Sequence, residues 1–172
     1  GGWFDCNKIR FRQGTPEKIG GWTPLTPNST YLGVCRSLWP WANTLGVVYI
    51  AVGTNLKMYI VSGTVYYDIT PIRSTSAAGA VTFAATNGSN VITATHTSFG
   101  SAVGDFVTFS GAVSLGGNIT AAVLNKNYQI ASTPTANTYT FVADATANAS
   151  DTGNGGAAVV GAYEVPVGFA NE

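Results

Sequence analysis

The apolar residues of this chain occur in brief runs that Gly, Pro, Asn and Ser interrupt, and this spacing constrains the fold most. No segment longer than about eight residues has the periodicity of an amphipathic helix. Only residues 119–124 could form a helical turn. Short runs rich in Val, Ile, Thr, Tyr and Phe between turn residues are typical of strands. The sequence therefore predicts an all-β chain of antiparallel sheets.

The N-terminal segment predicts a hairpin. Ile9 and Phe11 alternate with Arg10 and Arg12, so that one face of the first strand is apolar and the other cationic. Residues 14–17 (GTPE) are expected to form the turn, because Pro presets φ and Gly tolerates unusual backbone geometry. This pattern is a signal of architecture and names no reaction.

All four tryptophans lie in the first part of the chain. Trp3 and Trp22 each stand beside a pair of glycines, which suggests indoles packed over exposed backbone. Trp39 and Trp41 flank Pro40 and are expected in the connection between two strands. There they would shield the edge of a sheet or contact a neighbouring molecule.

Residues 32–73 predict an antiparallel meander. The tight turn is expected at Ser62-Gly63, and Pro71 should end the last strand because it cannot donate to the ladder. The second strand is apolar throughout, as in strands buried on both faces. Such a meander is the repeating unit of a β-propeller blade, or part of a sandwich. The expected strands cover residues 32–38, 47–52, 57–61 and 64–69.

The composition changes after a small-residue segment at 74–79, which is expected to be a linker. Residues 80–85 and 91–95 flank a hairpin turn at 87–90. Loops are expected at 110–122 and 148–156. The second part therefore predicts a small β-sandwich or barrel-like module of about five to six strands. Its further strands are expected at 106–109, 128–131, 138–142 and 157–165.

Charged residues make up only 9% of the chain, against about 25% in an average protein. With 45% apolar residues, this composition favours a subunit covered in an assembly over a free-standing neutral β domain. Residues 1–73 carry seven basic and three acidic side chains, and residues 74–172 carry one basic and five acidic ones. This split indicates a domain boundary near residue 74. The basic excess is too small for tight nucleic-acid binding.

The remaining whole-chain features are negative or open. Cys6 and Cys35 are too few for a disulfide scaffold; free, buried thiols are favoured, although the two could pair. No run of about 18 apolar residues exists, so no membrane-spanning helix is expected. The chain starts without Met and is interpreted as a piece of a longer protein.

No cluster of reactive residues indicates catalysis or metal binding. His96 is the only histidine and is expected to be an exposed or hydrogen-bonded loop residue. A triad of a serine, His96 and Asp105 would lack a nucleophile elbow. Asp5, Glu17 and Asp68 lie among cations and are interpreted as salt-bridge partners. The sequence therefore predicts no enzymatic activity and no cofactor.

Several longer runs carry a resemblance to a known family. The runs at 2–12, 14–22, 36–38, 51–55 and 67–73 (the last reading YDITPIR) resemble the N-terminal region of tail tube or nozzle proteins of short-tailed bacteriophages. Residues 74–164 resemble a module inserted in many such proteins and described as similar to a half-domain of ubiquitin-activating enzymes. That label implies a fold and not the activity, because residues 74–164 contain no cysteine. The marks of the insert are His96 and residues 103–111, 115–121, 137–139 and 161–164.

This resemblance implies a non-enzymatic virion protein of the phage tail, assembled in the host cytoplasm. Residues 1–73 would be the hairpin and meander of a β-propeller body, residues 74–164 the insert, and residues 165–172 the return to a body outside this chain. Copies would form a ring, expected to be a hexamer, below the portal and adaptor and in contact with tail-fibre proteins. DNA would leave through the ring without sequence-specific binding.

The resemblance also gives an expectation for the cations. A channel for DNA should not grip phosphates, so Arg10 and Arg12 are expected to be paired within or between subunits. From the residues alone, Arg10, Arg12 and Arg36 could equally face a polyanion or acidic partner, or form a solvated strand face. The candidate assembly residues are Trp3, Arg10, Arg12, Trp22, Arg36, Trp39 and Trp41.

Two other classes stay open. The insert could be an adhesion module that reads host glycans through aromatic side chains, although all four tryptophans precede residue 42. The chain could also be a capsid decoration protein. An enzyme is the weakest interpretation, and cleavage of polysaccharide by the isolated protein would revive it.

Overall fold

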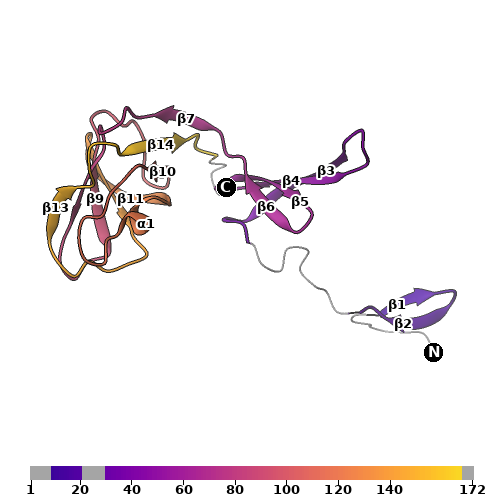
Figure 1. Cartoon of the computed structure of the whole chain (residues 1–172). Helices are drawn as coiled ribbons and strands as arrows, with labels where there is room; N and C mark the ends of the chain where they lie inside the picture. The colour runs from indigo at the N-terminus through magenta and orange to yellow at the C-terminus, as the bar shows by residue number, and fades with distance from the viewer. Residues whose placement is uncertain (1–8, 21–29, 168–172) are drawn as a thin grey trace.

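The computed structural model describes residues 9–20 and 30–167 of the chain (Figure 1). The strands form a two-stranded hairpin, a four-stranded meander and an eight-stranded sheet, and every strand pair is antiparallel. The predicted all-β fold class is therefore confirmed. Predictions on Trp3, Asp5, Cys6 and Trp22 lie outside the described residues. None of the described residues forms a helix long and apolar enough to cross a membrane.

The N-terminal hairpin pairs β1 (Ile9–Arg12) with β2 (Thr15–Lys18). The turn predicted at residues 14–17 is wrong, because the chain reverses at Gln13 and Gly14, with φ values of 51° and 80°. Two successive residues with positive φ match the twist of the strands they join. Pro16 consequently lies inside β2, which is tolerated because a two-stranded sheet has only edge strands.

The meander consists of β3 (Cys35–Ala42), β4 (Val48–Thr54), β5 (Met58–Ser62) and β6 (Val65–Asp68), hydrogen-bonded in that order. The tight turn predicted at Ser62-Gly63 is present but lies one residue later, at Gly63 and Thr64, because Ser62 is the last residue of β5 and pairs with Val65. Gly63 has a φ of 61°. β3 starts and ends later than the predicted strand at 32–38. β3 and β4 form a hairpin whose outer part, residues 38–51, we call the arm. Its tip reaches past the end of β5, which pairs with β4 only as far out as Tyr49 (Figure 1).

The tryptophans of the arm are not in the predicted connection. Trp39, Pro40 and Trp41 lie within β3, paired with β4. Trp39 is 71% exposed and therefore shields no core. Trp41 stacks on Tyr49 of β4, with ring centroids 5.6 Å apart. Pro40 is accommodated because β3 is an edge strand.

The prediction that residues 47–52 form a strand buried on both faces is also wrong. Val52 is buried, but Val47 and Val48 are exposed. A strand is buried on both faces only where other layers cover the sheet on both sides, and the outer part of β4 lies in the uncovered arm.

The eight-stranded sheet has the order β13-β8-β9-β12-β11-β10-β14-β7. The prediction of five to six strands misses β13, in the segment 148–156 predicted as a loop, and β7, which pairs with β14. The boundary expected near residue 74 falls inside β7. The helical turn expected at 119–124 is present as α1. The elements are β7 (Ile72–Thr75), β8 (Thr82–Ala85), β9 (Val91–Thr95), β10 (Phe106–Ser110), α1 (Ala121–Leu124), β11 (Asn127–Thr135), β12 (Thr138–Val142), β13 (Asp151–Asn154) and β14 (Val160–Glu164).

This sheet, which we call the module, curls around its own core. The pairing of β11 with β12 is irregular between residues 130 and 135, and such irregularities bend a strand. As a result Phe83 of β8 meets Phe109 of β10 edge-to-face, with centroids 4.9 Å apart, although three strands separate β8 from β10 in the sheet order. The meander buries far less. Its fully buried apolar residues are Val52, Tyr59 and Val61.

Candidate assembly interface

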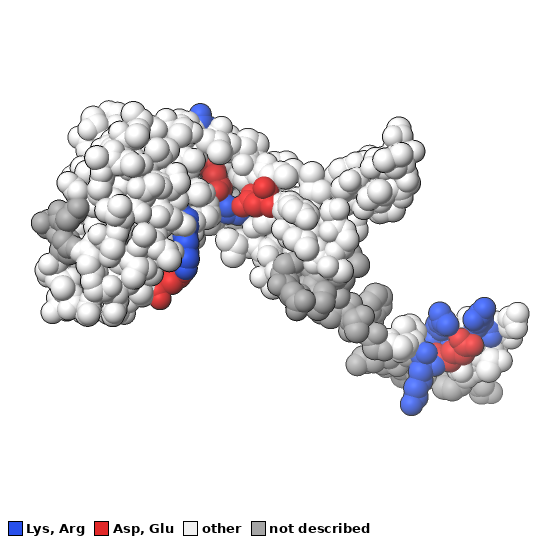
Figure 2. Space-filling view, viewed as in Figure 1, with Lys and Arg blue, Asp and Glu red and all other residues white. Residues whose placement is uncertain are grey.

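The arm exposes apolar side chains along its whole length. Leu45 at its tip is 86% exposed, and Leu38 and Val48 are each 60% exposed. Residues 37–56 contain no charged side chain, and Figure 2 shows the arm free of acidic and basic surface. Large contiguous apolar patches are rare on the surfaces of monomers and mark sites of interaction. The arm is therefore the strongest candidate for a contact surface.

One face of the meander is apolar from the arm inward to its small core. Strand register places alternate residues of β3, β4 and β5 on this face. A shallow groove of about 310 Å³ opens on it, lined by Val48, Ile50, Val61 and Gly63. The residues that share the face are Leu38, Pro40, Ala42, Val48, Ile50, Val52, Tyr59 and Val61.

The tip of the arm is held by Asn43. Its side-chain oxygen accepts hydrogen bonds from the backbone N–H groups of Leu45 at 2.9 Å and Val47 at 3.0 Å. Its own backbone N–H donates to the carbonyl of Val47, and its carbonyl accepts from Gly46, both at 3.0 Å. Such side-chain bonds order a loop from within. The tip therefore presents Leu45 on a fixed backbone.

A buried ionic joint connects the meander to the module. The Lys57 side chain is 2% exposed, and its Nζ lies 2.7 Å from Asp68 Oδ2 and 2.8 Å from Glu164 Oε1. The ammonium also lies 4.6 Å from the ring centroid of Phe106. Asn127 donates to the same Glu164 oxygen at 2.6 Å. Figure 2 shows acidic and basic side chains gathered where the meander meets the module. These contacts fix how the arm projects from the module.

The turn between β4 and β5 presents Lys57 to this joint. The Thr54 hydroxyl accepts from the N–H of Lys57 at 2.8 Å and donates to its carbonyl at 2.9 Å. Asn55 in the same turn accepts from the N–H of Val34 at 2.7 Å, which ties the turn to the chain before β3. The Thr54 hydroxyl thus both donates and accepts a hydrogen bond within the turn, and these bonds order the turn.

Burial and hydrogen bonding act against each other in the joint. Burial by itself lowers the pKa of Lys57, but hydrogen bonds to Asp68 and Glu164 outweigh it, and the pKa is raised. Burial likewise raises the pKa of Asp68, but its bonds to Lys57 and Thr70 lower it below its ordinary value. Both shifts favour the charged forms.

Of the acidic residues that the sequence predicts to form salt bridges, the two that the structure describes, Glu17 and Asp68, both form one. Glu17 accepts from Arg10 at 3.2 Å across the hairpin, and Asp68 accepts from Lys57, as interpreted from the sequence. The Arg12 side chain makes no hydrogen bond or ion pair within residues 9–20 and 30–167. Of the two pairings expected, that of Arg10 is present within this part of the chain, and pairing of Arg12 between subunits stays a prediction. Arg36 is exposed on β3, the strand that also carries Trp39 and Trp41.

Sequence reasoning missed the parts that matter most here. Lys57 and Glu164 are 107 positions apart, and neither stands in a recognisable motif. Leu45 lies in a turn that reads Asn-Thr-Leu-Gly, where a large apolar residue is unusual. The sequence does carry one signal for the uncharged surface of the arm, which is that no acidic residue occurs between Glu17 and Asp68.

His96 takes part in a network of tyrosine hydroxyls. Its Nδ1 lies 2.6 Å from the hydroxyl of Tyr163, which lies 2.9 Å from the hydroxyl of Tyr139. Burial lowers the pKa of His96 and raises that of Tyr163 to about 12. The expectation of a hydrogen-bonded histidine is confirmed. Within the described ranges no three His, Cys, Asp or Glu side chains group to hold a metal, and Cys35 is a free, half-buried thiol.

Comparisons with known proteins give little. No family model matches the chain, and no curated protein matches it. Among solved structures, the endosialidase of phage phi92 is similar over 87% of this chain and 21% of its own, with 18% identity and a TM-score of 0.42. The chain thus spans about a fifth of the length of that protein. A likeness at this level carries no conclusion about activity.

Proposed function

We propose that this chain is a structural subunit of a phage tail and works by assembling with copies of itself. The observation that carries the proposal is the uncharged, solvent-exposed arm, from Leu38 to Ala51. An apolar surface of this kind gains free energy when a partner covers it, by about 25 cal/mol for each Å² removed from water. Its scarcity of ionic side chains also matches the apolar cores of subunit interfaces.

The finer role comes from the sequence resemblance. It is a subunit of the tail tube or nozzle ring through which DNA leaves, with the meander as part of a propeller blade. The ring would be a hexamer that contacts the portal adaptor and the tail fibres. The intramolecular pair of Arg10 with Glu17 supports a surface that does not grip phosphate, because the guanidinium is partly neutralised.

Sedimentation velocity over a range of concentrations tests the self-assembly. We expect wild type to form a discrete oligomer, and Val48→Glu on the arm to shift the equilibrium toward monomer. Val142→Glu is the matched control, because Val142 is a similarly exposed valine of the module. A wild-type chain that stays monomeric at its highest soluble concentration refutes self-assembly. Electron microscopy of phage particles, locating the copies, tests the position in the tail.

A further inference from the structure

The tip of the arm has the properties of a preorganised docking knob. Leu45 is its most exposed large apolar side chain, on a loop that Asn43 orders. A loop already ordered in the free molecule loses little conformational entropy when it binds. Among the backbone N–H groups of residues 43–47, that of Thr44 is the one without a hydrogen bond to the described residues. The tip therefore offers one isobutyl group beside one free backbone N–H.

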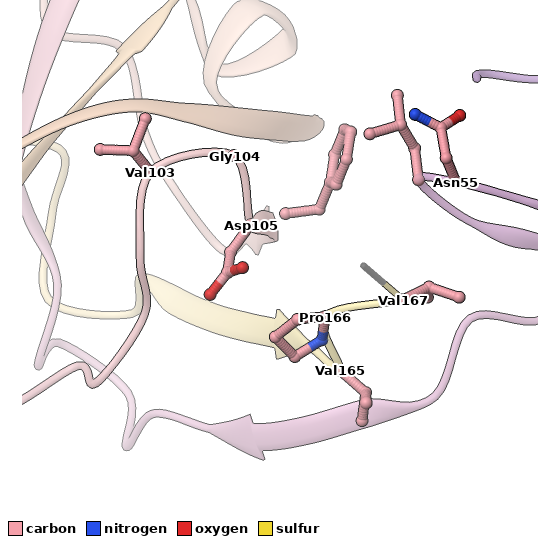
Figure 3. A pocket seen from close by; sticks show the side chains of 9 residues that line it. Asn55, Val103, Gly104, Asp105, Val165, Pro166 and Val167 are labelled. Carbon is pink, nitrogen blue, oxygen red and sulfur yellow. The ribbon is translucent and has the colours of Figure 1, made fainter. Parts of the chain in front are cut away.

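A matching cavity lies where the meander meets the module. Figure 3 shows Asn55, the loop around Asp105 and the chain around Pro166 converging on it from different sides. Its volume is about 200 Å³. An apolar cavity of about 150 Å³ accommodates benzene, so this one has room for a leucine side chain. The residues that line it are Asn55, Leu56, Val103, Gly104, Asp105, Phe106, Val165, Pro166 and Val167.

This cavity, the junction pocket, also carries a free acceptor. Asp105 Oδ2 accepts from the N–H of Ala102 at 2.9 Å, whereas Oδ1 makes no hydrogen bond among the described residues. Apart from Asn55 and Asp105, the side chains that line the pocket are apolar. The pocket thus pairs apolar walls with one unused carboxylate oxygen, which complements an apolar knob with one unused N–H.

We propose that the arm tip of one copy docks into the junction pocket of the next copy, with Leu45 in the cavity and the N–H of Thr44 donating to Asp105. This inference rests on the proposed self-assembly and names its contact. Figure 1 shows the tip pointing away from the module, so the tip does not fill the pocket of its own chain. Such a contact joins two different surfaces head-to-tail, and a head-to-tail contact closes into a ring when its rotation allows.

The edge strand of the arm favours docking by the tip over association by adding a strand to the sheet. Pro40 occupies the middle of β3, the edge strand of the meander. Proline has no N–H, and an edge strand carrying it lacks a donor for an added strand. The arm is therefore protected against pairing edge to edge while its tip stays free to dock.

Complementing variants test the contact. Leu45→Glu destroys the knob and leaves the pocket; Val103→Glu, at an exposed pocket residue, does the reverse. Each variant alone should self-associate at least about tenfold more weakly than wild type, a loss of about 1.4 kcal/mol. An equimolar mixture should form a one-to-one dimer, because one intact knob and one intact pocket remain. Val142→Glu should assemble as wild type does.

The outcomes separate this contact from the broader function. If wild type assembles and both Val103→Glu and the second pocket variant Val165→Glu assemble equally well, the docking site is wrong but self-assembly stands. A mixture of the Leu45 and Val103 variants that stays monomeric also overturns the contact. If wild type is monomeric, the proposed function fails and the contact fails with it. Circular dichroism of each variant establishes that it is folded before its assembly is measured.

Discussion

Replacing Lys57 by Met should strongly destabilise the joint between the meander and the module. The substitution keeps most of the apolar stem and removes the ammonium, which lies 2.7 Å from Asp68 and 2.8 Å from Glu164. Two carboxylates are then left facing each other without a cation. Glu164 is only 7% exposed, so its charge cannot be solvated where it stands.

The magnitude follows from how deeply each partner is buried. Removing one member of a buried ion pair costs about 3–5 kcal/mol, because the other charge stays buried. The share of Asp68 is small, since its side chain is 41% exposed and exposed pairs contribute about 0–1 kcal/mol. Asn127 still donates to Glu164, which offsets part of the loss. We expect a loss of about 3 kcal/mol, or a melting temperature lower by about 6–12 °C.

Thermal unfolding followed by circular dichroism measures this loss. Lys126→Met is the control, because it breaks an ion pair with Asp144 in which both side chains are well exposed, and should change the melting temperature little. Adding Glu164→Gln to Lys57→Met should recover most of the loss by removing the orphaned charge. A Lys57→Met protein that melts within about 2 °C of wild type would mean that the joint does not hold the two parts together.

Three further predictions concern pH and the module. The fold lowers the pKa of Asp68, so the stability that this carboxylate contributes is present above about pH 4 and is lost as the pH falls through its folded-state pKa. The fold raises the pKa of Lys57, so the stability that this ammonium contributes is lost only as the pH rises beyond about 10.5. Urea unfolding midpoints measured across this range should therefore fall at both ends, and a midpoint unchanged down to about pH 2 would contradict the acid limb. Tyr163→Phe removes the hydroxyl that joins the buried Tyr139 to the half-buried His96 and should cost about 1–3 kcal/mol in urea unfolding, whereas a neutral outcome would mean that water replaces it. Gly111→Ala should lower the melting temperature markedly, because Gly111 has a φ of 71° and a Cβ there would lie 2.2 Å from the carbonyl oxygen of Ala158; a stable Ala variant would show that the loop shifts freely.

The sequence predicts those elements that depend only on residues close together in the chain. Turn residues and periodicity predict the tight turn that contains Gly63 to within one residue, and they also predict the hairpin between β8 and β9 and the single helical turn of α1. The first turn was misplaced because Pro16 gave a strong conventional signal, while the residue that actually takes positive φ beside Gly14 is Gln13. Glutamine rarely adopts that conformation, so no sequence rule selects it.

Features set by the surroundings of a segment could not be predicted in the same way. Residues 47–52 read as a buried strand because an apolar run shows that burial is favourable but not what provides it. In this chain nothing among the described residues covers the outer part of β4. The joint between Lys57 and Glu164 is invisible for a related reason, since their proximity is created by the pairing of strands far apart in the sequence.

The meander and the module differ most in how far they bury their own apolar residues, and this difference supports the proposed self-assembly. The module closes around a core of aromatic and aliphatic side chains drawn from most of its strands. The meander has comparable apolar runs but fully buries only Val52, Tyr59 and Val61. If low charge were merely a property of the composition, both halves would be expected to bury their apolar residues alike. Instead the two most exposed of the large apolar side chains, Leu45 and Trp39, lie on the arm, which the ionic joint holds clear of the module. A chain that orders an uncovered surface in this way gains most from a partner that covers it.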